Sequence, residues 1–195
     1  MNLFFQHLSK YGRLKPELNE LFEKKLRLKV LDKDEMYLRE GEHEKHICFV
    51  EQGLLSYYFL DREGNMVIKK FFSEGEFVAS LSSVVSKMPS KFVIQALETC
   101  RLWELPYDYY RELMKTHLDL ALLQINYLEQ RWVLQKEMNE IKLKATDAKV
   151  RYLEFLKSYP HLKNRLRQHQ IASYLGVTPT QLSRIRAQLS DNKEL

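Results

Sequence analysis

The sequence predicts an α+β protein, in which an antiparallel β-roll of the double-stranded β-helix or jelly-roll type has flanking helices and is followed by a long helix and an all-α C-terminal unit. Short apolar runs alternate with regularly spaced glycines (Gly41, Gly53, Gly64 and Gly75), and strand-like alternation ends at Pro106. Glycine tolerates the positive φ of tight turns, so this spacing predicts a repeated strand, turn and strand. About eight short strands are expected between residues 26 and 106.

The segment KPELNELFEKKL predicts a short amphipathic helix before the first strand. Pro16 suits the first helical turn, where a missing backbone N–H costs no hydrogen bond. Leu18, Leu21, Phe22 and Leu26 then follow at helical spacing. The roll is therefore expected to carry a helix on its N-terminal side.

A short helix and then a long one are predicted after Pro106, in a region without strand-like alternation. The long helix has an apolar stripe at spacings of three and four, which either covers the roll or pairs with a second copy of the chain. At about 25 residues and 1.5 Å per residue it is longer than a small roll needs, which favours a parallel coiled-coil homodimer. The expected dimer contacts are Leu118, Leu122, Ile125, Leu128, Trp132 and the register-fixing Asn139.

The stretch QHQIASYLGVTPTQLSRIRAQL predicts two short helices joined by a turn at Gly176. Ala172 is small where a second helix must come close. Thr178 can cap the second helix, Pro179 suits its first position, and Gln181 can complete a capping box. This combination of small, turn and apolar positions is typical of a DNA-binding helix-turn-helix, whereas a helical hairpin packed on its own domain seldom has all of them.

The outer face of the second helix offers hydroxyls, an amide and guanidinium groups, which suit base edges and phosphates of a DNA major groove. Arg184 is the residue expected to read a base, most naturally guanine. Arg167, Gln170 and Ser173 are better placed for phosphates. The predicted DNA-binding residues are Arg167, Gln170, Ser173, Thr178, Thr180, Gln181, Ser183, Arg184 and Arg186.

Positive charge is concentrated in the C-terminal quarter of the chain. The net charge is +5, but residues 141–195 hold 11 Lys and Arg against 4 Asp and Glu, or +7, and residues 1–140 hold 20 against 22, or −2. Attraction to phosphate backbones would be strongest there, although an ordinary basic helical surface has the same charge. We expect three parts: a roll with its N-terminal helix at 1–106, a helical connector and dimerisation helix at 107–144, and the helix-turn-helix at 145–195.

In this order the three parts resemble the Crp/Fnr family of bacterial transcription regulators, over nearly the whole chain. RYLEFLKSYPHL followed by IASYLGVTPTQLSRIR is most similar to the branch common in Bacteroidetes. The resemblance implies an effector-sensing β-roll of the cyclic-nucleotide-binding type, a homodimer, and recognition helices about 34 Å apart on a palindromic operator. The implied partners are double-stranded DNA, a second copy of the chain, RNA polymerase and an unknown small-molecule effector.

One departure from the family concerns the recognition helix, which members commonly follow with a β-hairpin wing. This sequence ends at SDNKEL, without room for one. Some backbone contacts are therefore expected to be absent, and DNA affinity is expected to depend more on the dimer.

The stretch GEFVASLSSVVSKMPSKF is similar to the family's phosphate-binding cassette, but two discriminating residues differ. Ser80 stands where cyclic-nucleotide binders have a glutamate for the ribose, and Ser90 where they have the arginine for the phosphate. A buried cyclic phosphate needs such a cation, so cyclic AMP is not expected to bind in the usual mode. Another ligand, or none, remains open. The degenerate pocket comprises Gly75, Glu76, Phe77, Ser80, Leu81, Ser90 and Lys91, with Ala96 matching a later alanine.

Lysines near the cassette are possible substitutes for the missing arginine. Lys91 follows Ser90, but neighbours on an extended strand face opposite sides, so Lys91 serves only if the register slips by one residue. Lys69 and Lys70 are further candidates for an anion partner.

The sequence offers little support for metal, haem or catalytic chemistry. Cys48 and Cys100 are far apart, which argues against a zinc or iron–sulfur site. His43 and His46 could hold a metal weakly or ligate haem, but a solvated turn explains them as well. No nucleophile elbow, Walker loop or metal-ligand spacing indicates an enzyme. We expect no cofactor and no metal.

The sequence also has no long apolar run or secretory leader, which favours a cytoplasmic protein without membrane contact. The competing interpretation of the whole chain is a small-molecule sensor or protein adaptor that does not bind DNA. The cationic outer face of the second helix argues against it, because a protein-docking helix exposes apolar anchors.

Overall fold

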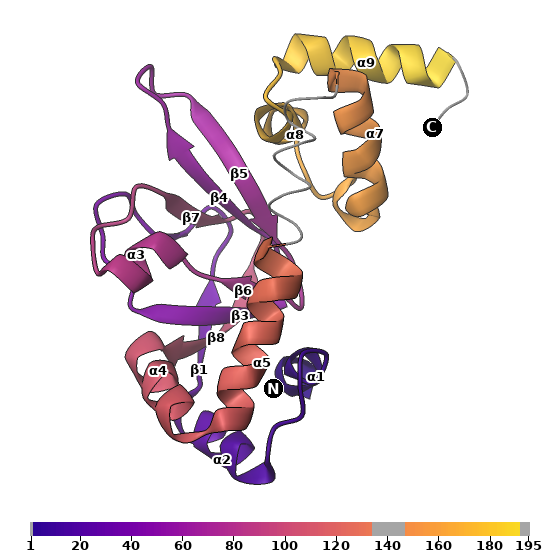
Figure 1. Ribbon diagram of the computed structural model, residues 1–195. Helices are drawn as coiled ribbons and strands as arrows, with labels where there is room; N and C mark the ends of the chain where they lie inside the picture. Colours follow the sequence, from indigo (N-terminus) through magenta and orange to yellow (C-terminus); the bar gives the residue numbers. More distant parts are fainter. Residues whose placement is uncertain (1, 134–146, 192–195) are drawn as a thin grey trace.

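The computed structural model describes residues 2–133 and 147–191, and Figure 1 shows a β-roll with helices at one end and a helical unit at the other. The strands are β1 (Arg27–Leu31), β2 (Met36–Leu38), β3 (His46–Gln52), β4 (Leu55–Leu60), β5 (Met66–Phe72), β6 (Phe77–Val78), β7 (Val93–Ala96) and β8 (Cys100–Pro106). They form two four-stranded sheets, β1-β8-β3-β6 and β2-β7-β4-β5, with antiparallel pairing throughout. The α+β class and the predicted strand number are confirmed.

The predicted glycine turns are present between these strands. Gly41, Gly53, Gly64 and Gly75 all have positive φ. Gly53, between β3 and β4, is the most constrained, because a Cβ built on it would lie 2.6 Å from Cys100 Sγ. The β3–β4 turn therefore packs directly on the start of β8 and has no room for a side chain.

The interior of the roll is filled by apolar side chains that alternate along the strands. Leu31, Val50, Leu55, Ile94 and Leu102 are fully buried in one cluster. Burial of such side chains contributes about 1.5–3 kcal/mol each. The alternation predicted from the sequence thus forms the sandwich core.

Four helices, α1 (Asn2–Leu8), α2 (Pro16–Lys25), α4 (Tyr107–Thr116) and α5 (Leu118–Leu128), pack on the outer face of the sheet that contains β3 and β8. The helix α2 begins at Pro16 as predicted, whereas α1 was not predicted. Phe4 of α1 contacts the ring of Phe22 in α2 and that of Phe49 in β3 with edge-on geometry. The apolar cluster that contains these rings joins the N-terminal helices and α5 to the roll.

The long helix has both of the faces that the sequence left as alternatives. Leu120 and Leu123 of α5 are buried against the roll, whereas Leu118, Leu122, Ile125 and Leu128 are 72%, 51%, 49% and 38% exposed. After Leu128 the chain continues as a π-helical turn, η1 (Glu129–Val133). Asn139 and the side chain of Trp132 lie outside the described part, so the coiled coil stays a prediction.

The C-terminal unit consists of α7 (Ala148–Ser158), the 3-10 turn η2 (Pro160–Leu162), α8 (Gln168–Leu175) and α9 (Pro179–Asp191). It is not a separate globule in this structure. Tyr152, Phe155 and Ile171 share one apolar cluster with Ile68 and Phe71 of β5. In Figure 1, α8 lies beside β5 and α9 lies at the end farthest from the roll. None of the described helices has the length and apolar character needed to span a membrane.

Candidate effector pocket and DNA-binding surface

The turn between α8 and α9 has the predicted helix-turn-helix geometry. Gly176 takes a left-handed conformation with φ of 66°, and the N–H of Val177 donates to the carbonyl of Ala172 at 3.0 Å. Ala172 is completely buried, so the two helices approach closely there. Leu182 and Leu189 of α9 are also buried and orient its opposite face outward.

The start of α9 is the predicted capping box. The N–H of Gln181 donates to Thr178 Oγ1 at 3.1 Å, and the N–H of Thr178 donates to Gln181 Oε1 at 2.9 Å. Pro179 is the first helical residue. The box satisfies two N–H groups that a helix start would otherwise leave unpaired.

Most of the predicted DNA-binding side chains are at least partly open to solvent. Arg184 and Ser183 are exposed on the outer face of α9, and Arg186 and Gln170 are half-buried. Gln170 has a second task, because its Oε1 accepts the N–H of Arg167 at 2.8 Å at the start of α8. The remaining exposed members of the set are Arg167, Thr178, Thr180 and Gln181.

Ser173, predicted as a phosphate contact, faces the roll instead of the open surface. Its hydroxyl donates to the carbonyl of Met66 at 2.6 Å and accepts the N–H of Ile68 at 3.0 Å. Both partners are backbone groups of β5. In this conformation the Ser173 hydroxyl therefore links α8 of the C-terminal unit to β5 of the roll.

The cassette begins as a tight turn at the end of β5. Gly75 has φ of 83°, and its N–H donates to the carbonyl of Val50 at 2.9 Å. The carboxylate of Glu76 accepts the N–H of Ser73 at 2.9 Å and pairs with Lys70 at 3.0 Å. Lys70, a candidate anion partner, is thus already paired.

The two serines that were matched to the family's ligand-binding positions bond to each other. Ser80 and Ser90 are 0% and 2% exposed, and their hydroxyl oxygens are 2.9 Å apart. The hydroxyl of Ser90 also donates to the carbonyl of Phe92 at 2.9 Å, and Tyr57 Oη lies 3.3 Å from Ser80 Oγ. Since a hydroxyl has one proton, Ser80 donates to Ser90 and Tyr57 donates to Ser80.

This hydrogen-bonded chain needs no anion to complete it. The N–H of Phe92 donates to Ser90 Oγ at 3.0 Å, which fills the remaining site on that oxygen. Burial raises the pKa of Tyr57, against smaller opposite effects of Ser80 and Ser82. The tyrosine therefore remains a neutral donor at physiological pH.

An aromatic pair and a lysine lie beside the serines. The rings of Tyr57 and Phe92 have centroids 4.6 Å apart, and Lys69 Nζ lies 4.8 Å from the Phe92 centroid and 5.6 Å from that of Tyr57. Such placement over ring faces stabilises an ammonium group. Ser90 and Lys91 precede β7 and are not on a strand, and Lys91 is exposed while Ser90 is buried, so Lys91 does not point inward.

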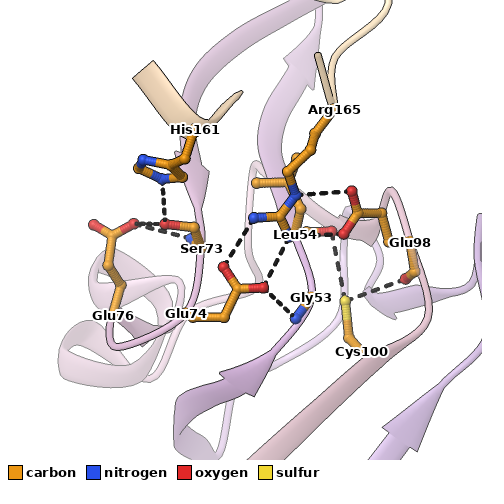
Figure 2. A network of polar contacts seen from close by, with 9 residues as sticks. All are labelled: Gly53, Leu54, Ser73, Glu74, Glu76, Glu98, Cys100, His161 and Arg165. Atoms are coloured by element: carbon orange, nitrogen blue, oxygen red, sulfur yellow. Dashed lines mark hydrogen bonds and ion pairs between the residues drawn. The ribbon is translucent and has the colours of Figure 1, made fainter. Parts of the chain in front are cut away.

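A polar network connects the cassette turn to the C-terminal unit, and no sequence pattern predicted it (Figure 2). The guanidinium of Arg165 donates four hydrogen bonds, to Glu74 at 2.9 and 2.8 Å and to Glu98 at 2.9 and 2.7 Å. His161 Nε2 lies 3.3 Å from the hydroxyl of Ser73. We call Arg165, Glu74 and Glu98 the Arg165 cluster.

The Arg165 cluster has the electrostatics of a tight ion pair. Partial burial on its own raises the pKa of Glu74, but hydrogen bonds from Arg165 and the N–H of Gly53 outweigh it and lower the pKa to about 2. Glu74 is therefore ionised at neutral pH. The same carboxylate holds the β3–β4 turn, because it accepts the N–H of Gly53 at 2.9 Å.

His43 and His46 border a cavity of about 470 Å³ on another part of the roll. It is also lined by Lys29, Tyr37, Leu38, Glu42, Glu44, Lys45 and Glu104. Within residues 2–133 and 147–191, no three His, Cys, Asp or Glu side chains are grouped closely enough to hold a metal ion. Cys48 and Cys100 are buried free thiols.

Comparison of the sequence with family models identifies the class of the roll. Residues 28–117 match the model of the cyclic nucleotide-binding domain. A comparison with curated proteins found no significant match.

Solved structures of the same fold cover most of the chain. FixK2 from Bradyrhizobium japonicum is 18% identical with a TM-score of 0.74, covering 86% of each chain. The c-di-GMP-responsive global regulator CLP of Xanthomonas campestris is 16% identical with a TM-score of 0.71, over 92% of this chain and 93% of CLP. A protein of Eubacterium rectale assigned to the Crp/Fnr family is 18% identical with a TM-score of 0.68, over 92% and 85%.

Residues 28–117 therefore resemble the cyclic nucleotide-binding domain, and the chain has the fold of the Crp/Fnr transcriptional regulators.

Proposed function

We propose that this protein is a homodimeric transcription regulator that binds a palindromic operator, with a β-roll that does not bind cyclic AMP in the usual mode. The observation that carries the proposal is the open outer face of α9. There Arg184, Ser183 and Thr180 are exposed on a capped helix whose opposite face is buried. Direct reading of bases requires a helix that is fixed in this way and free on its outer side.

The exposed stripe on α5 supports the homodimer. Leu118, Leu122, Ile125 and Leu128 are too exposed for a helix that only covers the roll. A contiguous apolar stripe on a monomer marks an interaction surface, and pairing with its own copy gives the two-fold symmetry of an operator.

The hydrogen-bonded chain of Tyr57, Ser80 and Ser90, called the serine chain below, supports the altered effector specificity. The hydroxyls of Ser80 and Ser90 are bonded to each other, and Ser90 also bonds to the backbone of Phe92, so neither serine needs a cyclic phosphate as a partner. CLP responds to c-di-GMP, so this fold is not restricted to one ligand.

The division of labour that we propose follows the predicted parts. The roll at residues 1–106 senses an effector or only supports the rest of the chain, residues 107–144 form the dimer, and residues 145–195 bind DNA. RNA polymerase is a further partner, and the protein acts in the cytoplasm. We assign no catalytic activity, since Crp/Fnr regulators are typically not enzymes.

Selection of bound duplexes from a random pool tests DNA binding, followed by fluorescence anisotropy with the selected duplex at two salt concentrations. Affinity is expected to fall steeply with salt, because phosphate contacts release counterions. The variant Arg184→Ala should lose about 1–3 kcal/mol of discrimination at one base pair, with Arg13→Ala, an exposed arginine of the N-terminal region, as the control. Equal affinity and selectivity of Arg184→Ala and the parent would show that Arg184 does not read a base. A selection that enriches no duplex would favour the sensor or adaptor function instead.

A further inference from the structure

We propose that the Arg165 cluster holds the DNA-binding unit, which is the C-terminal unit of α7, η2, α8 and α9, on the β-roll without any effector. The regulator would then bind its operator in the ligand-free state. The inference deepens the proposed function and depends on it for its DNA-binding part.

The first step is the geometry of the Arg165 cluster. Arg165 lies between η2 and α8, Glu74 lies in the turn that starts the cassette, and Glu98 lies in the β7–β8 turn. The guanidinium thus joins the DNA-binding unit to two turns of the roll at once, as Figure 2 shows. Bidentate guanidinium–carboxylate pairs are directional, so they set an orientation as well as a distance.

The second step is that the Arg165 cluster is one of three contacts along the same edge. Ser173 bonds to two backbone groups of β5, and the ring of Tyr174 lies 5.4 Å from that of Phe71. Ile68 and Phe71 of β5 belong to the apolar cluster that contains Phe155 and Ile171. A unit held by an ion-pair cluster, hydrogen bonds and a shared core is fixed in position, whereas polar inter-domain surfaces alone permit relative motion.

The third step is that this docked arrangement leaves the recognition surface open. The covered side of the unit is the side of α8 that carries Ser173, while Thr180, Ser183 and Arg184 on α9 are exposed. Docking on the roll therefore does not block α9. It would instead reduce the orientational freedom that two recognition helices lose on binding one operator.

The fourth step concerns the effector. The hydroxyls of Tyr57, Ser80 and Ser90 satisfy one another, and Lys69 lies over the rings of Phe92 and Tyr57. Because these groups already have partners inside the chain, no ligand is required to complete the roll. The same strand, β5, carries Lys69 and the backbone groups that hold Ser173, so the closed pocket and the docked unit are parts of one arrangement.

The experiment uses the full chain and measures docking separately from DNA binding. The amide of Ile68, on the edge strand β5, donates to Ser173 Oγ, so its hydrogen exchange reports docking. Exchange is followed without DNA or nucleotide. Operator affinity is measured by anisotropy with the selected duplex, with and without cyclic AMP.

Three variants are compared with the parent: Arg165→Gln, Glu98→Gln, and the control Lys163→Gln, an exposed neighbour with the same charge change as Arg165→Gln. Loss of the Arg165 cluster should accelerate Ile68 exchange and weaken operator binding about tenfold each, within the range of coupling in ion-pair networks. The informative case is Glu98→Gln, which removes a negative charge. Simple attraction to DNA would tighten its binding, whereas loss of positioning weakens it.

The parent is expected to bind the operator without ligand, with less than about a twofold change on addition of cyclic AMP. Unchanged Ile68 exchange in Arg165→Gln would overturn the docking role of the Arg165 cluster. Tighter binding by Glu98→Gln, or a parent that binds only with a nucleotide, would overturn its role in DNA binding. Failure of the parent to bind any duplex would contradict the proposed function, and the Ile68 exchange would still decide the docking role.

Discussion

Ser80 and Ser90 are both buried in the β-roll, and their hydroxyl oxygens lie 2.9 Å apart. At the positions where cyclic-nucleotide binders of the resembled family place an acid and an arginine, this chain has two neutral groups that bond to each other. A buried anion at these two positions would lack the paired guanidinium that compensates its lost hydration. The first two predictions follow from this pair.

Cyclic AMP is expected to leave the melting temperature of the protein unchanged. A ligand that binds only the native state must stabilise it, by about 2.7 kcal/mol at one hundred times its Kd. Differential scanning fluorimetry with millimolar cyclic AMP provides the measurement. A clear, saturable rise in Tm would show that the serine pair does not exclude the nucleotide.

The variant Ser90→Ala is expected to lose about 1–3 kcal/mol of unfolding free energy, because it leaves the N–H of Phe92 and the proton of Ser80 without a buried partner. Urea denaturation measures the loss. Ser158→Ala, at an exposed position of α7, serves as the control and should change stability by less than about 0.5 kcal/mol. Equal stabilities of the two variants would mean that the serine chain contributes nothing.

The variant Leu122→Glu should shift the chain from dimer to monomer without unfolding it. Leu122 is 51% exposed, so the monomer tolerates a carboxylate there, whereas an apolar helix–helix contact does not. Sedimentation equilibrium is expected to show dimerisation weakened about tenfold or more, since 1.4 kcal/mol already gives a factor of ten. Gln130→Glu adds the same charge in η1, outside the apolar stripe. A Leu122→Glu protein that remains as dimeric as Gln130→Glu would place the interface elsewhere.

The variant Gly53→Ala is expected to destabilise the roll by about 3 kcal/mol or more, from backbone strain together with steric overlap. Gly53 has φ of 105°, and an added Cβ would lie 2.6 Å from Cys100 Sγ and 2.8 Å from Cys100 Cα. Gly64→Ala is the matched control, because Gly64 has φ of 82° and no atom within 4 Å of a built Cβ. It should lose only about 1 kcal/mol. Thermal or urea unfolding measures both variants. Similar losses of unfolding free energy in Gly53→Ala and Gly64→Ala would show that the close contact with Cys100 adds nothing to the cost at Gly53.

His7 predicts a pH dependence of stability. It is buried in α1 beside the rings of Tyr11, Phe49 and Phe77. Burial first, and then the charges of Lys10 and Arg131, lower its pKa from 6.5 to about 4. The unfolded chain therefore binds the proton more readily than the folded one. The unfolding free energy is unaffected by His7 above about pH 6.5, and it decreases as the pH falls from there toward 4.

Between pH 7 and pH 5 this linkage amounts to roughly 2 kcal/mol. The variant His7→Phe should have a flatter dependence of unfolding free energy on pH over that range, measured by urea denaturation at several pH values. His43→Phe, at an exposed position, should retain the slope of the parent. If His7→Phe retains the full slope, another group is responsible for it.

Much of the fold could be predicted because its signals are local. Gly176, Thr178 and Gln181 lie within six positions of one another, and the backbone freedom of Gly176 together with the side chains of Thr178 and Gln181 defines the turn and the capped start of α9. The strand order and the pairing of the two sheets could not be predicted in this way. They depend on which apolar faces meet when the chain closes.

The sequence by itself determined the roll and the helix-turn-helix, since both follow from residue type and short spacing, whereas the resemblance to a known family singled out Ser80 and Ser90. Only the tertiary structure decided what those residues contact. Ser173 meets Ile68 of β5 across 105 positions, and Arg165 meets Glu74 and Glu98 across 91 and 67 positions. No periodicity encodes such contacts, because they join surfaces whose residues are far apart in the sequence. For that reason a predicted phosphate contact became a hydrogen bond to the roll.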